Sequence, residues 1–313
     1  MPEGLDVLDQ AGAPAGKDAC VGPVQVGPAS GAVDPAVLAI PVAAQAEVGA
    51  LRFLGYGLEP AAALPGAFVE VRLFWQVRER PAPGLALWLA WVQGGEVLAQ
   101  EARPLAGLGR DAADWPPGHA FRTRHLVRVP LHAREGEVLL QAEVGREGLE
   151  TLGAPLDLGA VQVLPVQRTF ALPAPRVPQR AQFGEGILLL GADLPRDPVR
   201  PGDSNPVTLY WQATAEMERS YTGFLHLLDA EGRVRAGVDR VPGEGARPTN
   251  TWLPPEVLAE SFTLAAPEEP GTYWLEVGWY DAARPGMPRL PATDAKGNPL
   301  GDRLLLGPVE VAP

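Results

Sequence analysis

Hydrophobic and polar residues alternate along much of this chain in short runs, which is the period-two pattern of half-buried β-strands. Between 207 and 213, for example, Val207, Leu209 and Trp211 would share one face of a strand. Gly and Pro residues separate these runs, and no stretch longer than a turn or two has helical periodicity. In its second half the pattern predicts strands at 187–194, 207–213, 221–228, 233–240, 257–264, 272–280 and 304–311.

The pattern is also repeated along the chain. Trp75 aligns with Trp211 at an offset of 136 residues (211 − 75), and Trp115 aligns with Trp252 at 137 (252 − 115). A third, shorter copy places Asp9 on Asp294, at an offset of 285 (294 − 9). Self-similarity at a long fixed spacing indicates a tandem array of one folded unit.

The repeat and the strand pattern together predict an all-β protein of tandem immunoglobulin-like or fibronectin-III-like β-sandwiches. The expected segments are 1–28, the C-terminal remnant of an upstream sandwich repeat; 29–45, a linker; 46–164, the first β-sandwich repeat; 165–182, a stiff Pro-rich linker; and 183–313, the second β-sandwich repeat. We expect the remnant at 1–28 to be mobile or to pair with an exposed edge of the first full repeat.

Composition narrows the range of partners. The 313 residues carry a formal net charge of −12, which argues against binding to nucleic acid and to anionic membrane surfaces. Cys20 is the only cysteine, so no internal disulfide can form. No secretory signal and no run of about 18 apolar residues is evident. Because Met1 falls inside a repeat, the missing signal does not place the protein in the cytoplasm.

Motifs for catalysis are absent from the sequence: it has no G-x-S-x-G, no phosphate-binding loop and no H-E-x-x-H. We therefore expect no enzyme, no cofactor and no metal site. His119, His125 and His132 are expected to be exposed polar residues on a strand and its flanks. His226 is expected to be a hydrogen-bonded histidine of a sandwich.

One loop could in principle bind Ca²⁺ through oxygen ligands. Its candidate residues are Asp294, Asn298 and Asp302. The alternative is that they form turns in a hairpin through side-chain hydrogen bonds to the backbone, and the N-terminal copy favours this because it has Ala13 in place of Asn298.

Aromatic residues give a second line of evidence. The repeated tryptophans are expected to lie in the cores, since aromatic side chains dominate core burial. Tyr210, Trp274 and Tyr280 are not repeated, and they alternate with core residues. If their faces are solvated, these three side chains would form a platform on which a sugar could stack. The alternative is that loops or the neighbouring domain cover them.

Several segments of the second repeat together resemble a module of bacterial surface and membrane proteins. They are Leu189–Leu194 (LLGADL), Val207–Ala213 (VTLYWQA), Tyr221–Gly232 (YTGFLHLLDAEG), Pro248–Trp252 (PTNTW), Pro270–Asp281 (PGTYWLEVGWYD) and Gly297–Asp302 (GNPLGD). The module is the immunoglobulin-like sandwich that follows the transmembrane part of some dolichyl-phosphate-mannose-type glycosyltransferases. The resemblance covers 183–313 well and 46–164 loosely, and these motifs mark a fold.

The resemblance implies an extracytoplasmic or cell-surface location and a role as a non-catalytic spacer or interaction module of a larger membrane-anchored protein. The catalytic residues of such transferases would lie in a membrane domain that is not part of this sequence. Glycans or other surface proteins are the partners it implies, without membrane insertion by this segment. The alternative function is a carbohydrate-binding module that uses Tyr210, Trp274 and Tyr280.

Overall fold

All regular structure longer than a single turn is β-strand in the part of the chain that is described. The computed structural model describes residues 38–107, 111–146, 151–195 and 198–312, together with two short strands at 7–8 and 14–16. Within these ranges the helical elements are three-residue 3₁₀ turns. The predicted all-β class is confirmed.

The first domain, residues 42–163, consists of two sheets. One has the order β3-β4-β6-β9, with β3 at Val42–Val48, β4 at Leu51–Glu59, β6 at Phe68–Val77 and β9 at Ala120–Arg128. The other has the order β5-β11-β10-β7-β8, with β5 at Ala62–Ala63, β11 at Leu156–Val163, β10 at Gly136–Arg146, β7 at Leu85–Gln93 and β8 at Glu96–Pro104.

The second domain, residues 177–311, has the same plan with a wider first sheet. That sheet has the order β17-β14-β13-β12-β19-β20, with β17 at Val257–Ala265, β14 at Ser204–Ala213, β13 at Ile187–Asp193, β12 at Val177–Phe183, β19 at Ala292–Asp294 and β20 at Pro299–Gly301. The facing sheet has the order β16-β15-β18-β21, with β16 at Val234–Arg240, β15 at Thr222–Leu228, β18 at Gly271–Tyr280 and β21 at Leu304–Val311.

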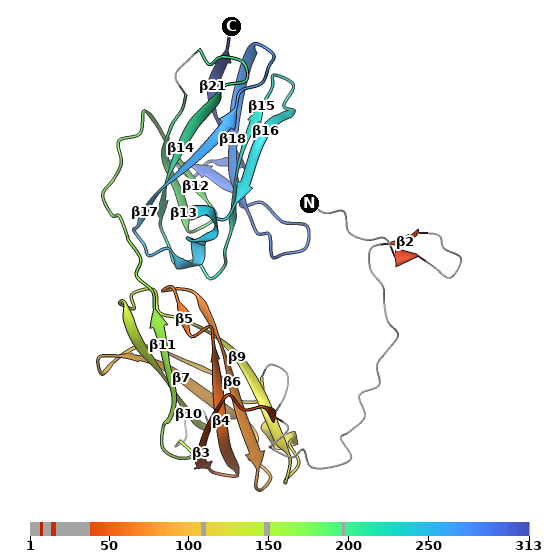
Figure 1. The fold of residues 1–313 in the computed structure, drawn as a ribbon, viewed down its shortest axis with the longest axis vertical. Coiled ribbons are helices and arrows are strands. Elements are labelled where there is room, and N and C mark those ends of the chain that lie inside the picture. The colour runs from red at the N-terminus through yellow and green to blue at the C-terminus, as the bar shows by residue number, and fades with distance from the viewer. Residues whose placement is uncertain are drawn as a thin grey trace.

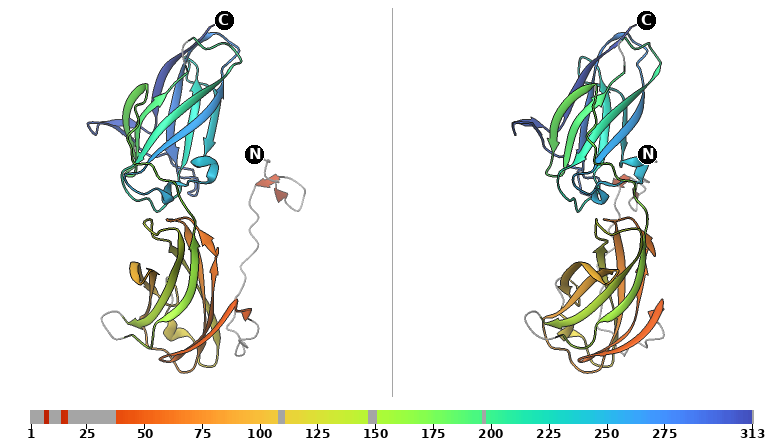
Figure 2. Two further views of the ribbon diagram at one scale, coloured as in Figure 1. Left: turned by 60° about the vertical axis from the view of Figure 1, so that its left-hand side comes forward. Right: turned by 90° about the vertical axis from the view of Figure 1, so that its left-hand side faces the viewer.

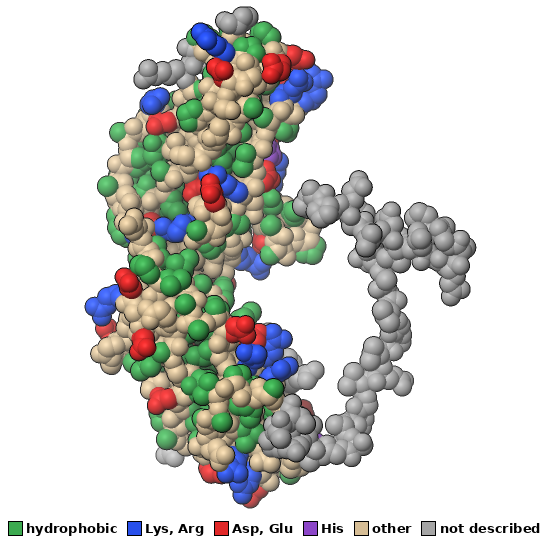
Figure 3. All heavy atoms as spheres, in the orientation of Figure 1, with side chains coloured by type: hydrophobic (Ala, Val, Ile, Leu, Met, Phe, Trp, Pro, Cys, Tyr) green, Lys and Arg blue, Asp and Glu red, His purple; other side chains and the backbone are tan. Residues whose placement is uncertain are grey.

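The two domains lie end to end along the long axis of the molecule (Figures 1 and 2). Each has its own hydrophobic core between its two sheets. As expected, the repeated tryptophans are buried, and in the second core Trp211 and Trp252 both pack edge-on against Trp279, with ring centroids 5.0 and 5.8 Å away. On the face shown in Figure 3, side chains of both charges are scattered over both domains.

The N-terminal segment contains a small hairpin, in which β1 (Val7–Leu8) pairs with β2 (Pro14–Gly16). At the repeat offset of 285 residues, these strands correspond to β19 and β20 of the second domain. The register is the same in both copies, with Val7 opposite Gly16 and Leu8 opposite Pro14 in one, and Ala292 opposite Gly301 and Thr293 opposite Pro299 in the other. The rest of the expected remnant at 1–28, and its expected mobility, lie outside the described residues.

Two strands occupy sequence that was expected to be linker. β12 begins at Val177, within the expected linker 165–182, and β3 begins at Val42, within 29–45. Pro178 made the first of these ranges look irregular, because proline cannot donate a ladder hydrogen bond. It is tolerated because β19 pairs with β12 only at Ala181–Phe183, so the outer edge of β12 has no ladder partner at Pro178.

Gly55 and Gly191 occupy equivalent positions in the two repeats, and the same backbone geometry accounts for both. Each lies at a break of strand register, with φ of +147° and +148°. This region of φ is strained for residues with a side chain. A Cβ at Gly191 would also lie 2.6 Å from the carbonyl oxygen of Val177. The repeated glycine is therefore required by a β-bulge.

Gly191→Ala is expected to lower the free energy of unfolding by about 2 kcal/mol, because it combines backbone strain with a backbone clash. Gly271→Ala is the control. Gly271 lies in β18 without a positive φ, and a Cβ there would approach only the Tyr273 ring, at 3.6 Å. The control should change stability by less than about 1 kcal/mol in urea unfolding. Equal effects of the two substitutions would contradict the bulge explanation.

The prediction that His125 is exposed is wrong. It lies in β9 on the face that carries Thr123 and Val127 into the interior, and it is 5% exposed. Burial, with a smaller contribution from the charge of Arg103, lowers the pKa of His125 to about 4. The neighbouring arginines Arg122 and Arg124 are exposed and suggested a polar strand, but they occupy the alternate, outward positions.

This histidine should make the first domain sensitive to acid. In the unfolded chain its pKa is about 6.5, so as the pH falls from 6.5 to 4 the unfolded state takes up a proton that the folded state does not. The contribution is fully present above pH 6.5 and should fall by about 2 kcal/mol between pH 7 and pH 4.5. Urea unfolding of the wild type and of His125→Leu at both pH values measures it. An equal loss of stability in both proteins would exclude His125 as the cause.

Candidate functional site at the domain junction

The structure does not bring the three predicted sugar-binding aromatics together. Tyr210 lies in β14 of one sheet, whereas Trp274 and Tyr280 lie in β18 of the facing sheet. All three are half-buried, and the Tyr210 hydroxyl donates a hydrogen bond to Asp193, at 3.0 Å. The outward faces of two packed sheets point in opposite directions, so the three side chains form no common platform.

Near Tyr280, the outward face of the second sheet carries a polar cluster centred on Glu276. His226 hydrogen-bonds to the carboxylates of both Glu276 and Asp239, at 3.1 and 2.7 Å, as expected for a partnered histidine. Arg289 and Arg303 also donate to Glu276. Burial acts to raise the pKa of Glu276, but the hydrogen bonds from Arg303, His226 and Arg289 outweigh it and lower the pKa. All partners of this carboxylate are therefore accounted for within the fold.

The loop considered for Ca²⁺ forms a turn instead. The Asp294 carboxylate accepts hydrogen bonds from the backbone N–H groups of Lys296 and Asn298 and from the Asn298 side chain, at 2.8 to 2.9 Å. These bonds, that from the Asn298 side chain first, lower the pKa of Asp294. No group of three or more His, Cys, Asp or Glu side chains within the described ranges is arranged to hold a metal ion.

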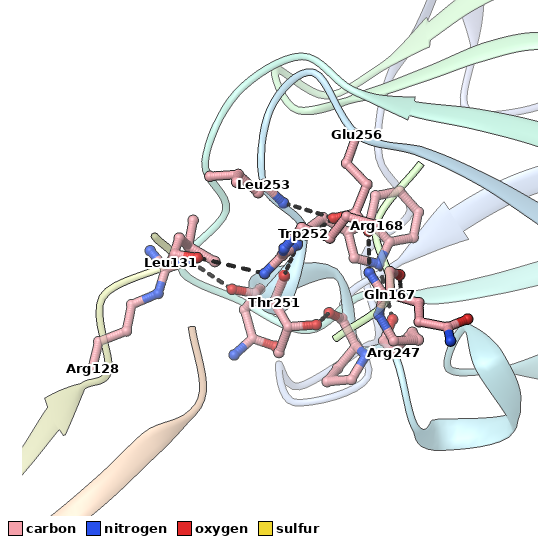
Figure 4. Close-up of polar contacts among 11 residues, drawn as sticks. Arg128, Leu131, Gln167, Arg168, Arg247, Thr251, Trp252, Leu253 and Glu256 are labelled. Carbon is pink, nitrogen blue, oxygen red and sulfur yellow. Dashed lines mark hydrogen bonds and ion pairs between the residues drawn. The ribbon is translucent and has the colours of Figure 1, made fainter. Parts of the chain in front are cut away.

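Polar groups converge instead where the two domains meet (Figure 4). The second domain presents here a 3₁₀ turn, Thr249–Thr251, in which Thr249, Asn250 and Thr251 are all buried. Trp252 follows the turn and anchors it, because its ring is fully buried in the core and its indole N–H donates to the backbone oxygen of Arg247, at 2.9 Å. The equivalent turn of the first domain, Ala112–Asp114, also precedes a buried tryptophan, Trp115.

A buried carboxylate holds this end of the second domain to the linker. Glu256 is completely buried, and its two oxygens accept hydrogen bonds from Arg168 of the linker and Arg247 of the second domain. The backbone N–H of Leu253 donates a further bond to it, at 3.0 Å. Two guanidinium groups and one backbone donor thus compensate the removal of this charge from water. Next to Arg168 in the linker, Thr169 forms a β-bridge with Val257, the first residue of β17.

Side-chain hydrogen bonds connect the two domains here, one through the linker and two directly. The Arg168 guanidinium, besides its bonds to Glu256 and to the Thr251 carbonyl, reaches the carbonyl oxygen of Leu131 in the first domain, at 3.5 Å. Asn250 donates its side-chain amide to the carbonyl of Gly66, at 3.0 Å, and Arg128 donates to the carbonyl of Asn250, at 2.6 Å. Gly66 can have no side chain here, because a Cβ would clash with the Asn250 carbonyl.

Side chains of opposite charge also face each other across the junction. Arg128, at the end of β9, faces Glu216 of the second domain, at 3.6 Å. Burial lowers the pKa of Arg128, and the charges of Glu216 and Glu218 oppose that effect. A basic residue of the first domain therefore meets acidic residues of the second.

Sequence reasoning did not find these junction residues, although a signal was present. The alignment of the repeats pairs Asn250 with Ala113 and Glu256 with His119, so both residues differ between copies beside a shared tryptophan. Differences at such positions indicate where one domain makes contacts that the other does not make. The contacts of Asn250 and Glu256 could be identified only from the structure, because Arg168, for example, lies 88 residues from Glu256 along the chain.

Comparison with known proteins identifies no family for this chain. No family model and no curated protein matches the chain. Among solved structures, a transglutaminase from red sea bream matches with a TM-score of 0.24 and 9% identity, over 85% of this chain and 32% of its own length. The chain thus spans about a third of that structure. Within the described ranges, no helix is both long and apolar enough to cross a membrane.

One expectation from the sequence is corrected by this comparison. The chain was expected not to be an enzyme, whereas the protein that it matches is one, and we do not retain that expectation. A TM-score of 0.24 transfers no activity to this chain.

Glu256→Ala is expected to lower the free energy of unfolding of the second domain by about 3 kcal/mol, because it leaves two largely buried guanidinium groups without their carboxylate. Glu231→Ala is the matched control, since it removes an exposed ion pair with Arg233. The control should cost at most about 1 kcal/mol. Thermal or urea unfolding distinguishes them, and a Glu256→Ala effect as small as that of the control would contradict the role given to this carboxylate.

Proposed function

We propose that this chain is a spacer and interaction module: two β-sandwiches held at a fixed separation and orientation, as part of a larger surface or membrane-anchored protein. The observation that carries the proposal is the junction itself. A flexible tether would leave two domains to move independently, which is the default for domains joined by a small polar interface. Here the linker arginine Arg168 bonds to both domains at once.

The contacts at the junction also fix orientation, not only distance. Asn250 and Arg128 form reciprocal bonds, since one donates to the first domain and the other to the second. Gly66 brings the two backbones into direct contact. Bonds in both directions around one close backbone contact resist twisting as well as bending, and such stiffness serves a spacer.

The immunoglobulin-like character and the extracytoplasmic location remain predictions from the resemblance described above. One detail supports the first of them. The hydroxyl of Tyr273 donates to the backbone oxygen of Glu269, four residues earlier, at 2.8 Å. This is the hydrogen bond expected of a tyrosine corner. Protease treatment of intact cells tests the location: digestion of the chain from outside supports it, and complete protection contradicts it.

The proposal of a fixed separation is tested most directly by weakening the junction while both domains stay folded. Spin labels at Val97→Cys and Val234→Cys, both exposed and one in each domain, in a Cys20→Ser background, report the inter-domain distance. We expect one narrow distance distribution for the parent protein. Asn250→Ala, which removes the amide bond to Gly66, should broaden it.

The matched control is Asn205→Ala. Asn205 also donates its side-chain amide to a backbone carbonyl, that of Asp203, but within the second domain. This variant should leave the distance distribution unchanged. A broad distribution already in the parent protein would overturn the proposal of a fixed spacer.

A further inference from the structure

The second domain carries a loop that the first domain lacks. Between β18 and β21 the chain has 23 residues (304 − 280 − 1), whereas only 9 residues separate β10 from β11 (156 − 146 − 1). The added residues form the hairpin β19–β20 and, before it, a loop at 282–288. The loop has the sequence AARPGMP, and every one of its residues is exposed. It therefore adds a surface to the second domain that the shared repeat does not require.

Hydrogen bonds fix the shape of this loop and direct a methionine toward solvent. The backbone N–H of Ala283 donates to the carboxylate of Asp281, at 3.1 Å, and that of Met287 donates to the carbonyl of Arg284, at 3.0 Å. Met287 has a φ of +43°, which residues with a side chain rarely adopt, and its side chain is 57% exposed. Strained residues of this kind cluster at binding sites.

The loop also carries a positive charge that has no partner in the molecule. Arg284 is exposed, and its guanidinium has no hydrogen bond or ion pair with any residue that the structure describes. Arg289, which follows the loop, differs in this respect because it donates to Glu276. The loop thus presents a free cation close to an exposed apolar side chain.

A cavity of about 360 Å³ lies beside the base of the loop. Its apolar wall includes the buried side chains of Phe183 and Met217, together with Leu290, two residues beyond the loop. On its rim, Arg219 donates to the carboxylate of Asp281, where the loop begins, at 3.2 Å. Loop and cavity are therefore adjoining parts of one surface of the second domain.

The rim of the cavity carries the charge opposite to that of the loop. Glu185 and Glu218 line it, are exposed, and have no ion pair with any described residue. Glu216, a third carboxylate of the rim, already faces Arg128 across the junction. Two carboxylates thus remain available to a cation from another molecule, and the wall suits an apolar side chain. The loop 282–288 carries both.

We propose that this cavity receives the loop 282–288 of a second copy of the chain, with Met287 of one copy against the apolar wall of the other. Arg284 then lies beside the rim carboxylates Glu185 and Glu218. Because loop and cavity adjoin, a twofold axis lets each copy insert its loop into the other, and the dimer is closed. Two short loops bury little area, so we expect a weak dimer with a dissociation constant of about 10–100 µM.

This interface goes beyond the proposed spacer and does not depend on it. Loop and cavity both belong to the second domain, so they keep their relative positions whether or not the first domain is held in a fixed orientation. A dimer could form in a protein whose junction is loose, and a stiff junction could occur in a monomer. Measurements of association and of inter-domain distance therefore test the two proposals separately.

Sedimentation equilibrium of the full chain, at about 1–500 µM and in a Cys20→Ser background that excludes disulfide dimers, measures the association. Arg284→Glu should weaken it at least about tenfold, because like charges then meet at the rim. Arg80→Glu is the matched control, since Arg80 is also exposed and unpaired but lies in the first domain. It should leave the dissociation constant unchanged. A parent protein that stays monomeric throughout, or equal effects of the two substitutions, would overturn the proposal.

Met287→Gly separates binding from folding, because it removes the apolar side chain and relieves the positive φ. It should weaken the dimer at least about tenfold without lowering the urea midpoint. A lower midpoint would show that Met287 serves the stability of its own domain, which contradicts the role proposed for it. Unchanged association of this variant would contradict it equally.

The pairing of charges is tested by a second reversal, Glu185→Arg. Glu185 is chosen because the charge of Glu218 also acts on Arg128 at the junction. Alone, this change should weaken the dimer as Arg284→Glu does. Combined in one chain, the two reversals should weaken it less than either does alone, because opposite charges meet again. A combined loss as large as that of either single change would overturn the proposed contact.

Discussion

The arrangement of the two domains depends on one buried charge, the carboxylate of Glu256. Removing a carboxylate from water is costly, so the fold must bring cations to it, and the cations available are Arg247 of its own domain and Arg168 of the linker. Because Arg168 also reaches Leu131, compensation of the charge simultaneously orients the first domain. The stability of the second domain and the geometry of the pair are therefore coupled through Arg168.

The strands and the cores could be predicted from sequence because they follow from local rules. Alternation along β14 and β18 places Trp211 and Trp279 inside, whatever lies elsewhere in the chain. Local rules were insufficient for β12, where Pro178 hid a strand whose remaining pattern is regular. They were also insufficient for His125. The exposed Arg122 and Arg124 alternate with it along β9, so their charge indicates only the outer face of the strand and not the inner face on which His125 lies.

The candidate site could not be predicted in the same way. Alternation indicates that Tyr210 and Trp274 point outward, but not that their sheets face opposite sides, which depends on how the sheets pair. The junction arises from residues far apart in sequence, such as Asn250 with Gly66. The sequence held only an unrecognised signal for it, since Asn250 and Glu256 lie beside a shared tryptophan where the first repeat has Ala113 and His119.

The hairpin β19–β20 affects how readily the second domain pairs edge to edge with another chain. A long, bare edge strand invites pairing with another chain and is a route to aggregation. In the second domain the hairpin covers β12 and leaves a terminal strand of three residues that begins with Pro299, while the linker bridges the opposite edge at Val257. The edge of the six-stranded sheet that this hairpin forms thus presents little backbone for lateral pairing. At that edge a neighbouring chain meets few free backbone donors and acceptors, so the hairpin acts there against side-by-side association of the domains.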